Sequence, residues 1–180
     1  MKKLAVLMII PALAMFMVPA LASANWYYWW GIQGTWEMSA SGSCIHSSEN
    51  YETGANGWLT APSTSNVYAG VTVSNGTWIF KPNGEGTYSQ TIYATILPGG
   101  NAPAPLAVRV FPQKNLVFSY DITPSGDIKV TAGGIELIGK ISKDMSSMTL
   151  LSANNIQDLR NFGLGYTICN TARTLIKVRE

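Results

Sequence analysis

The chain has 180 residues, of which 47% are hydrophobic and 12% charged, and its formal net charge is +2. This balance lacks the basic face that nucleic-acid binding requires, and it lacks a polybasic patch for an anionic membrane surface. Low charge combined with many Thr, Ser, Asn, Gly and aromatic residues is typical of an exported β protein.

Residues 1–24 have the organisation of a secretory signal peptide. Lys2 and Lys3 form a positive start, an apolar stretch follows, and the Ala-Ser-Ala at 22–24 is a small-x-small cleavage pattern. The apolar stretch is shorter than the about 20 residues that span a bilayer. We therefore predict cleavage after this segment, a single mature domain at 25–180 with no integral membrane span, and a periplasmic or extracellular location in a bacterium.

The run Asn-Trp-Tyr-Tyr-Trp-Trp at 25–30 contains more consecutive aromatics than one face of a strand or helix can hold. In one interpretation it plugs an end of the domain or covers its outer wall, with some rings buried. In another it is an exposed surface for a membrane interface, a glycan or a partner protein. The candidate interaction residues are Trp26, Tyr27, Tyr28, Trp29 and Trp30.

The stretch 77–93 predicts a β-hairpin. Trp78 and Phe80 lie two residues apart and so face one way on a strand, while Asn83 and Gly84 tolerate the positive φ of a tight turn. The rest of the chain contains similar segments, and Ser-Asn-Gly at 74–76 is expected to separate two of them. The other expected strands are 34–38, 67–73, 107–111, 116–123, 128–131, 135–141, 148–151, 166–169 and 174–178.

Between these strands lie two long connections and one predicted helix. The polar stretch 39–66 is expected to be a functional loop or to contain a short strand around 45–51. The Pro/Gly-rich stretch 97–105 cannot be a central strand. Residues 154–161 are expected to form a short helix near the C-terminus. Eight to ten evenly spaced strands predict an all-β fold, either a single antiparallel up-and-down β-barrel or a β-sandwich.

Two cysteines, Cys44 and Cys169, lie in the predicted mature chain. Export places them where oxidation is permitted, so we predict a disulfide between them. The rival interpretations are a zinc site or a reactive thiol. Zinc requires three or four clustered ligands, and the chain has one histidine, His46. We therefore expect no metal site, and we expect His46 to be a solvated loop residue.

The Gly34-Thr35-Trp36 element, which opens a strand after a short apolar lead-in, is similar to the start of lipocalin and wider calycin barrels. The hairpin at 78–88 also resembles those of bacterial lipocalin-like domains. The resemblance covers one tripeptide, one hairpin and the strand count. It implies that Trp36 closes one end of an up-and-down barrel and is covered by an Arg from near the chain end, which Arg173 matches.

Two charged residues interrupt apolar strands. Arg109 lies between Val108 and Val110, and Glu136 lies between two apolar residues. If the face of Arg109 is the lumen, its guanidinium could hold a carboxylate head group. If it faces solvent, it is an ordinary surface residue, and the same question applies to Glu136. The two could also pair inside, since the strand register decides which face each occupies.

A small closed barrel is either filled by its own side chains or keeps a cavity for one small ligand. The favoured hypothesis is an exported, cofactor-free binding protein for a small apolar or amphipathic ligand in or at the mouth of the barrel. One alternative is an envelope protein-interaction module or an inhibitor of an exported hydrolase. The other is a cofactor-free barrel enzyme of the cyclase or isomerase type. The candidate ligand-binding residues are Trp36, Trp78, Phe80, Tyr88, Arg109, Phe118 and Tyr120.

The enzyme alternative is the less favoured because no catalytic constellation stands out. The carboxylates are scattered without a marked pair for acid–base chemistry. His46 has serines near it in sequence, but adjacency on a polar loop is not the geometry of a nucleophile, a base and an acid. We therefore predict no catalytic residue.

Overall fold

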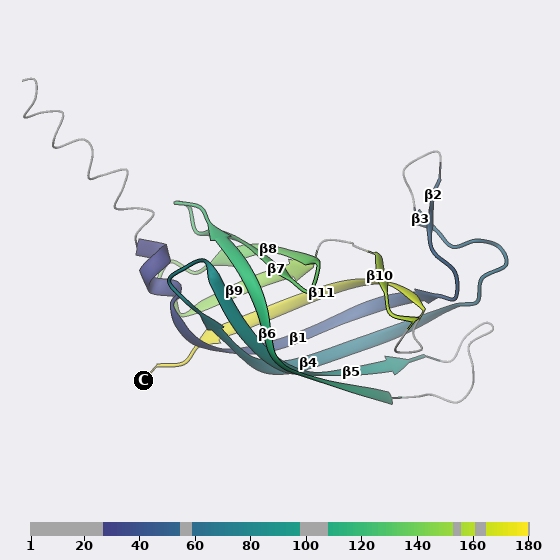
Figure 1. The fold of residues 1–180 in the computed structure, drawn as a ribbon, viewed down its shortest axis with the longest axis horizontal. Helices are drawn as coiled ribbons and strands as arrows, with labels where there is room; N and C mark the ends of the chain where they lie inside the picture. Colours follow the sequence, from purple (N-terminus) through teal and green to yellow (C-terminus); the bar gives the residue numbers. More distant parts are fainter. Residues whose placement is uncertain (1–26, 55–58, 98–107, 153–155, 161–164, 180) are drawn as a thin grey trace, which may run out of the picture.

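The computed structural model describes residues 27–54, 59–97, 108–152, 156–160 and 165–179. Within these ranges most of the chain is β-strand (Figure 1). Eight strands follow one another as antiparallel neighbours, and the first also pairs with the last, which closes an up-and-down barrel. The eight are β1 (Gly34–Ser47), β4 (Val67–Phe80), β5 (Glu85–Ile96), β6 (Val108–Ile122), β7 (Asp127–Ala132), β8 (Ile135–Ile141), β9 (Ser147–Ser152) and β11 (Tyr166–Lys177). The predicted all-β barrel is confirmed, in preference to the sandwich.

Three short strands lie outside this ring. β2 (Glu52–Thr53) and β3 (Leu59–Thr60) form a separate two-stranded sheet that projects from one end of the barrel (Figure 1). β10 (Ile156–Asp158) pairs with β11 along the edge that β9 uses farther on. β10 thus continues the line of β9.

The predicted helix near the C-terminus is wrong. Ile156–Asp158 is strand β10, and residues 153–155 and 161–164 lie outside the described part. The physical reason is that β11 extends beyond the end of β9, so its edge offers a ladder that satisfies the backbone of three residues. The short helix of the described chain lies instead at residues 27–32. No helix among the described residues is long and apolar enough to cross a bilayer.

Part of the polar stretch 39–66 forms a strand, although its composition predicts a loop. β1 continues to Ser47 because it is paired on both edges, with β4 and with β11. His46 is therefore 2% exposed on the inner face of β1 and is not a solvated loop residue. Pairing on both sides has overridden the weak strand propensity of the small residues that precede it.

The expected break at 74–76 is also wrong, because β4 runs through it without interruption. Gly76 allows the neighbouring strand β5 to approach closely and does not form a turn. A methyl group added there would lie 2.2 Å from the backbone oxygen of Ser89 and 2.6 Å from the Cα of Gln90. The turn after this strand lies where it was predicted, with Gly84 at φ 78°. The hairpin of β4 and β5 is thus confirmed, and it is longer than expected.

The strands differ in length, and this difference divides the interior in two. β1, β4, β5, β6 and β11 have 12 to 15 residues, whereas β7, β8 and β9 have six or seven. Only the last five residues of β6, Phe118–Ile122, pair with β7. The long strands therefore continue past the short ones (Figure 1), so that one half of the barrel is ringed by eight strands and the other by fewer.

The fully ringed half is packed solid with aromatic and aliphatic side chains. Trp78 stacks between Tyr88 and Phe118, with ring centroids 5.0 and 4.9 Å away, and Phe118 lies 4.9 Å from Phe80. The N-terminal helix covers this end, where Ile32 is fully buried. Such a filled end supplies most of the apolar burial that stabilises the fold.

Candidate ligand-binding cavity

A cavity of about 480 Å³ occupies the other half of the barrel. Its walls come from the long strands, from the β7–β8 turn and from β10. The volume lies within the range of about 300–1,000 Å³ for small-molecule sites. None of the described residues that line it is Asp or Glu. The cavity therefore has no acidic group of its own to neutralise a cation.

The cavity has an apolar wall along β5 and β6. Ile92 and Ala94 of β5 line it from one strand, and Phe111 and Leu116 of β6 line it from the next. Leu116 and Phe111 both face the interior, although they are five residues apart, because β6 has an irregularity opposite Tyr88–Gln90 that resets its alternation of inner and outer positions. This wall suits a hydrocarbon or aromatic group.

Arg173 of β11 projects into the cavity from the side of the filled half. It occupies an inner position, because its register partner on β1 is Ala40, which is 9% exposed and belongs to the core. Its Nε and Nη1 atoms are buried and have no hydrogen-bond partner. Burial lowers the pKa of Arg173, although the neighbouring Tyr88 partly opposes this. A guanidinium stays protonated at neutral pH even so, and the result is a half-buried cation with two buried nitrogen atoms that have no hydrogen-bond partner.

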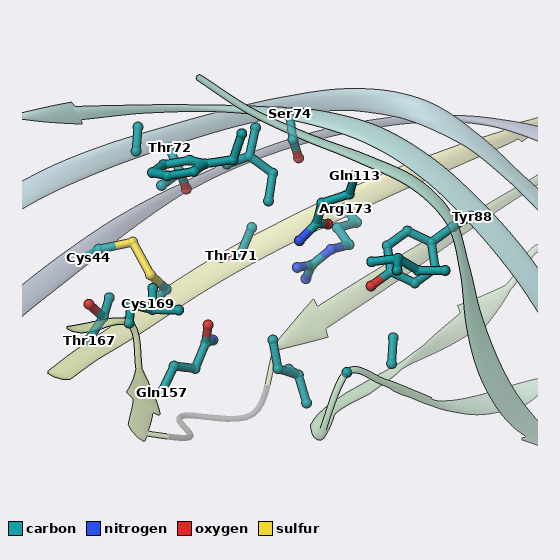
Figure 2. A pocket seen from close by; sticks show the side chains of 18 of the residues that line it. Cys44, Thr72, Ser74, Tyr88, Gln113, Gln157, Thr167, Cys169, Thr171 and Arg173 are labelled. Atoms are coloured by element: carbon teal, nitrogen blue, oxygen red, sulfur yellow. A yellow bond between two sulfur atoms is a disulfide. The ribbon is translucent and has the colours of Figure 1, made fainter. Parts of the chain in front are cut away.

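Two further polar groups surround this guanidinium. Figure 2 shows Gln113 and Tyr88 beside Arg173, with their polar ends pointing into the same space. The Oε1 atom of Gln113 accepts a hydrogen bond from Gln90 Nε2 at 2.6 Å, which leaves its NH₂ group for the cavity. Burial raises the pKa of Tyr88, and the charge of Arg173 opposes that rise. Tyr88 therefore presents a neutral hydroxyl at neutral pH, and the cluster is rich in donors.

The opposite end of the cavity is formed by the disulfide and by His46. Cys44 and Cys169 are bonded, which confirms the predicted pairing. His46 Nδ1 lies 2.8 Å from Thr167 Oγ1, and the imidazole stacks on Tyr68 with ring centroids 4.9 Å apart. These contacts hold the imidazole against the wall. Among the described residues, no group of three His, Cys, Asp or Glu side chains is placed to bind a metal ion.

The structure separates the seven candidate ligand-binding residues. Tyr88 lines the cavity. Arg109 lies on the inner face of β6, opposite Ala94, but its side chain is exposed and outside the cavity lining. The other five are buried in the filled half and pack on one another there: Trp36, Trp78, Phe80, Phe118 and Tyr120.

The register also answers the question about Glu136. Its side chain lies on the outer face of β8, where its carboxylate is 2.6 Å from the Nζ of Lys129 on β7. Glu136 and Arg109 therefore lie on opposite faces of the sheet and do not pair inside. The sequence left both arrangements open because each residue sits between two apolar neighbours.

The aromatic run at 27–30 divides between burial and exposure. Tyr28 and Trp29 pack against the filled half, and Trp29 lies 5.3 Å from Tyr120 by ring centroid. Tyr27 and Trp30 are 55% and 60% exposed. The predicted residue Trp26 lies outside the described residues. The run thus covers the filled end with part of its rings and leaves two of them at the surface.

Trp36 is held by the helix and by a cation, but that cation is not Arg173. Its Nε1 donates to the backbone oxygen of Ile32 at 2.7 Å, and Lys177 Nζ lies 5.9 Å from its ring centroid. Lys177 also donates to the backbone oxygen of Gly31. Lys177 is the register partner of Trp36, whereas Arg173 lies four residues away along β11 and serves the cavity instead.

Sequence reasoning missed Arg173 and Gln113 as cavity residues. The available signal for Arg173 was its position two residues before Leu175, an inner residue that is fully buried. That signal requires knowing which face of β11 is the inner one. For Gln113 no alternation rule would have sufficed, since the irregularity in β6 shifts its face.

No protein-family model, no curated protein and no solved structure matches the chain at a significant level. The functional argument is therefore carried by the cavity and by the groups that line it.

Proposed function

We propose that the chain is an exported binding protein that holds a small amphipathic molecule, with its anionic head group on Arg173, inside a lipocalin-like barrel. The observation that carries this proposal is the guanidinium of Arg173, whose Nε and Nη1 atoms are buried without a partner at one end of a cavity of about 480 Å³. Export rests on the signal-like segment 1–24 and agrees with the Cys44–Cys169 disulfide.

The charge of the head group follows from the donors around it. Burying an unpaired charge is costly, and an ionic partner with good geometry removes much of that cost. Arg173 offers the unused N–H groups of Nε and Nη1, Gln113 offers an NH₂ group and Tyr88 offers a hydroxyl. A carboxylate accepts several hydrogen bonds and suits the fork of a guanidinium. An ammonium head group would meet the guanidinium as a like charge.

The apolar part of the ligand follows from the shape of the cavity. Arg173 and Thr167 both line it from β11, and six residues of strand span about 20 Å. Between them the opposite wall is formed by Ile92, Ala94 and Phe111. An elongated molecule with its carboxylate on Arg173 would lay its tail along this wall, toward the disulfide.

The experiment compares three amphiphiles with the same tail: dodecanoate, dodecanol and dodecylammonium. Titration calorimetry on delipidated protein is expected to show tight binding for the carboxylate and weaker binding for the other two. Arg173→Gln should weaken the binding of dodecanoate by roughly tenfold to a hundredfold. This corresponds to about 1.5–3 kcal/mol, the value for hydrogen bonds to a charged group. The affinity for dodecanol should change little.

Arg109→Gln is the matched control, because Arg109 is a cation on the same inner face but outside the cavity lining. It should bind dodecanoate like the unmodified chain. Equal affinity for the carboxylate and the alcohol would contradict the assignment of the head group. Failure of all three probes, together with the absence of any adduct in native mass spectra of protein purified from its host, would contradict the carrier function itself.

A further inference from the structure

The outer surface of the long strands carries an unusually apolar area on the half of the barrel that contains the cavity. On β4 the outward-facing Val71 and Val73 are 40% and 52% exposed, and on β6 Val108 and Val110 are 59% and 54% exposed. Tyr93 of β5 is 38% exposed and Ile45 of β1 is 52% exposed. We call these six residues the outer apolar face.

The strand register shows that this face is contiguous. Val73, Tyr93 and Val110 are direct cross-strand partners on three adjacent strands, so they form one row, although Val110 also borders the cavity. The next row consists of Val71, Thr95 and Val108, and Ile45 lies in the row after that, opposite Ala69. Directly opposed residues of neighbouring strands have Cβ atoms about 4.5–5.5 Å apart, so the side chains of each row touch or nearly touch.

The outer apolar face is also uncharged. On β1 its two rows continue with Ser41 and Ser43. One row nearer the filled half, the outward residues are Ser39, Asn75, Thr91 and Pro112. An apolar centre with a neutral polar rim is the arrangement found in protein–protein interfaces. Monomeric proteins seldom leave a contiguous apolar patch beyond a few hundred Å² exposed.

We propose that the outer apolar face is the interface between two copies of this chain, packed sheet against sheet. The face is complementary to itself because it is apolar and carries no charge that a two-fold contact would oppose. Its six residues expose on the order of 500 Å² before their Thr and Ser neighbours are counted, compared with about 800 Å² per partner in a standard stable interface. When two sheets pack face to face about 10 Å apart, their side chains interdigitate, and rows of β-branched residues suit this packing.

Two observations favour this occupant over the alternatives. A lipid surface attracts faces that combine several aromatics with Lys or Arg, whereas this face has one aromatic residue, Tyr93, and no basic residue. Edge-to-edge pairing through β6 is hindered because Pro112, in the middle of that strand, has no N–H to donate. Face-to-face packing leaves that edge unused.

The test is sedimentation velocity of the oxidised chain, expressed with its own N-terminal segment in a bacterial host. We expect a dimer at micromolar concentration. Val73→Glu should weaken the dimer by at least about tenfold, because it would bury an unpaired carboxylate at the contact. Val71→Thr combined with Val73→Thr keeps the β-branched shape and should also weaken it.

The matched control is Ile138→Glu, since Ile138 is 51% exposed and faces outward on β8, away from this face. It should sediment as a dimer. Circular dichroism and an intact disulfide establish that each variant is folded. A monomer throughout the micromolar range would overturn the proposal, as would a dimer that Val73→Glu leaves unchanged. A monomer that binds neutral phosphatidylcholine vesicles through Val73 would identify a lipid surface instead and would also overturn it.

Discussion

Cys44 and Cys169 lie directly opposite one another on β1 and β11, the two strands whose pairing closes the barrel. Their Cα atoms are 4.1 Å apart, and the bond between their sulfur atoms joins residues that are 125 positions apart in the chain. The bond therefore fastens the closing seam, and it does so beside the cavity rather than in the filled half. This position links the stability of the barrel to the integrity of the cavity.

Loss of the disulfide is expected to destabilise the fold strongly. Replacing both cysteines by alanine should lower the free energy of unfolding by about 2–5 kcal/mol, because the unfolded chain regains the freedom of a long loop. Urea unfolding of the variant and of the oxidised chain measures this difference. A midpoint that is the same in oxidising and reducing buffer would contradict the prediction.

A second prediction concerns Tyr120, whose hydroxyl donates to the backbone oxygen of Lys81 inside the filled half. Burial raises the pKa of Tyr120 from 10.0 to about 12. A raised pKa means that the folded state favours the protonated phenol. Its contribution is therefore complete below pH 10 and is lost as the pH rises through about 12. Tyr120→Phe should remove this alkaline loss and cost about 1 kcal/mol at neutral pH, the usual value of one hydrogen bond.

The measurement is the urea midpoint of unfolding from pH 8 upward, conditions chosen to bracket the ordinary tyrosine pKa. Tyr27→Phe serves as the control, because Tyr27 is 55% exposed. If Tyr120→Phe and the unmodified chain lose stability in parallel above pH 10, the coupling of this phenol to folding is disproved.

A third prediction concerns Asp127, the first residue of β7. Hydrogen bonds from Lys140 and Ser125 lower the pKa of Asp127 from 3.8 to about 2. A lowered pKa means that the folded state favours the carboxylate. Its contribution is present above about pH 4 and is lost as the pH falls toward 2. Asp127→Asn should therefore flatten the acid limb of the stability profile, measured as the urea midpoint between these two pH values.

Lys140→Met tests the cause of this effect. Lys140 Nζ lies 2.7 Å from the carboxylate of Asp127, so its removal should raise the carboxyl pKa and flatten the same limb. Both groups are exposed, and the effect on stability at neutral pH should be small. An acid limb that is unchanged in both variants would contradict the assignment.

The features that the sequence predicted correctly are those that do not depend on the strand register. The turn at Asn83-Gly84 needs only residues that tolerate its backbone angles. The Cys44–Cys169 bond needed only a count of sulfur atoms and the inference of export. The wrong or undecided features depended on register. Whether Arg109 or Arg173 faces the cavity is fixed by which residues of adjacent strands are opposed, and a shift of one residue reverses the answer.

His46 and the filled half illustrate the same limit. His46 follows a run of small polar residues typical of a loop, but pairing on both edges of β1 buries it. The aromatic residues that composition offered for a ligand pocket instead pack on one another, because the shorter strands β7, β8 and β9 complete the ring around them. The lengths of β7, β8 and β9 therefore decide which aromatic residues can contact a ligand.

The last prediction separates a binding role of Arg173 from a structural one. Lys177 and Arg173 are two inner-facing cations on the same strand. Lys177 is satisfied by the backbone oxygen of Gly31 and by the ring of Trp36. Arg173 keeps Nε and Nη1 buried without a partner. Replacing an unpaired buried charge by an apolar side chain removes a desolvation cost, whereas replacing a partnered one removes contacts.

Arg173→Met should therefore raise the free energy of unfolding of the ligand-free protein by about 1–3 kcal/mol while dodecanoate binding is lost. Lys177→Met should lower that free energy, by on the order of 1 kcal/mol, and leave binding intact. Urea unfolding of delipidated protein, with and without dodecanoate, measures both quantities. If Arg173→Met destabilises the ligand-free barrel as Lys177→Met does, Arg173 is a structural residue. A group retained at a cost to the empty fold is instead the signature of a site that awaits its ligand.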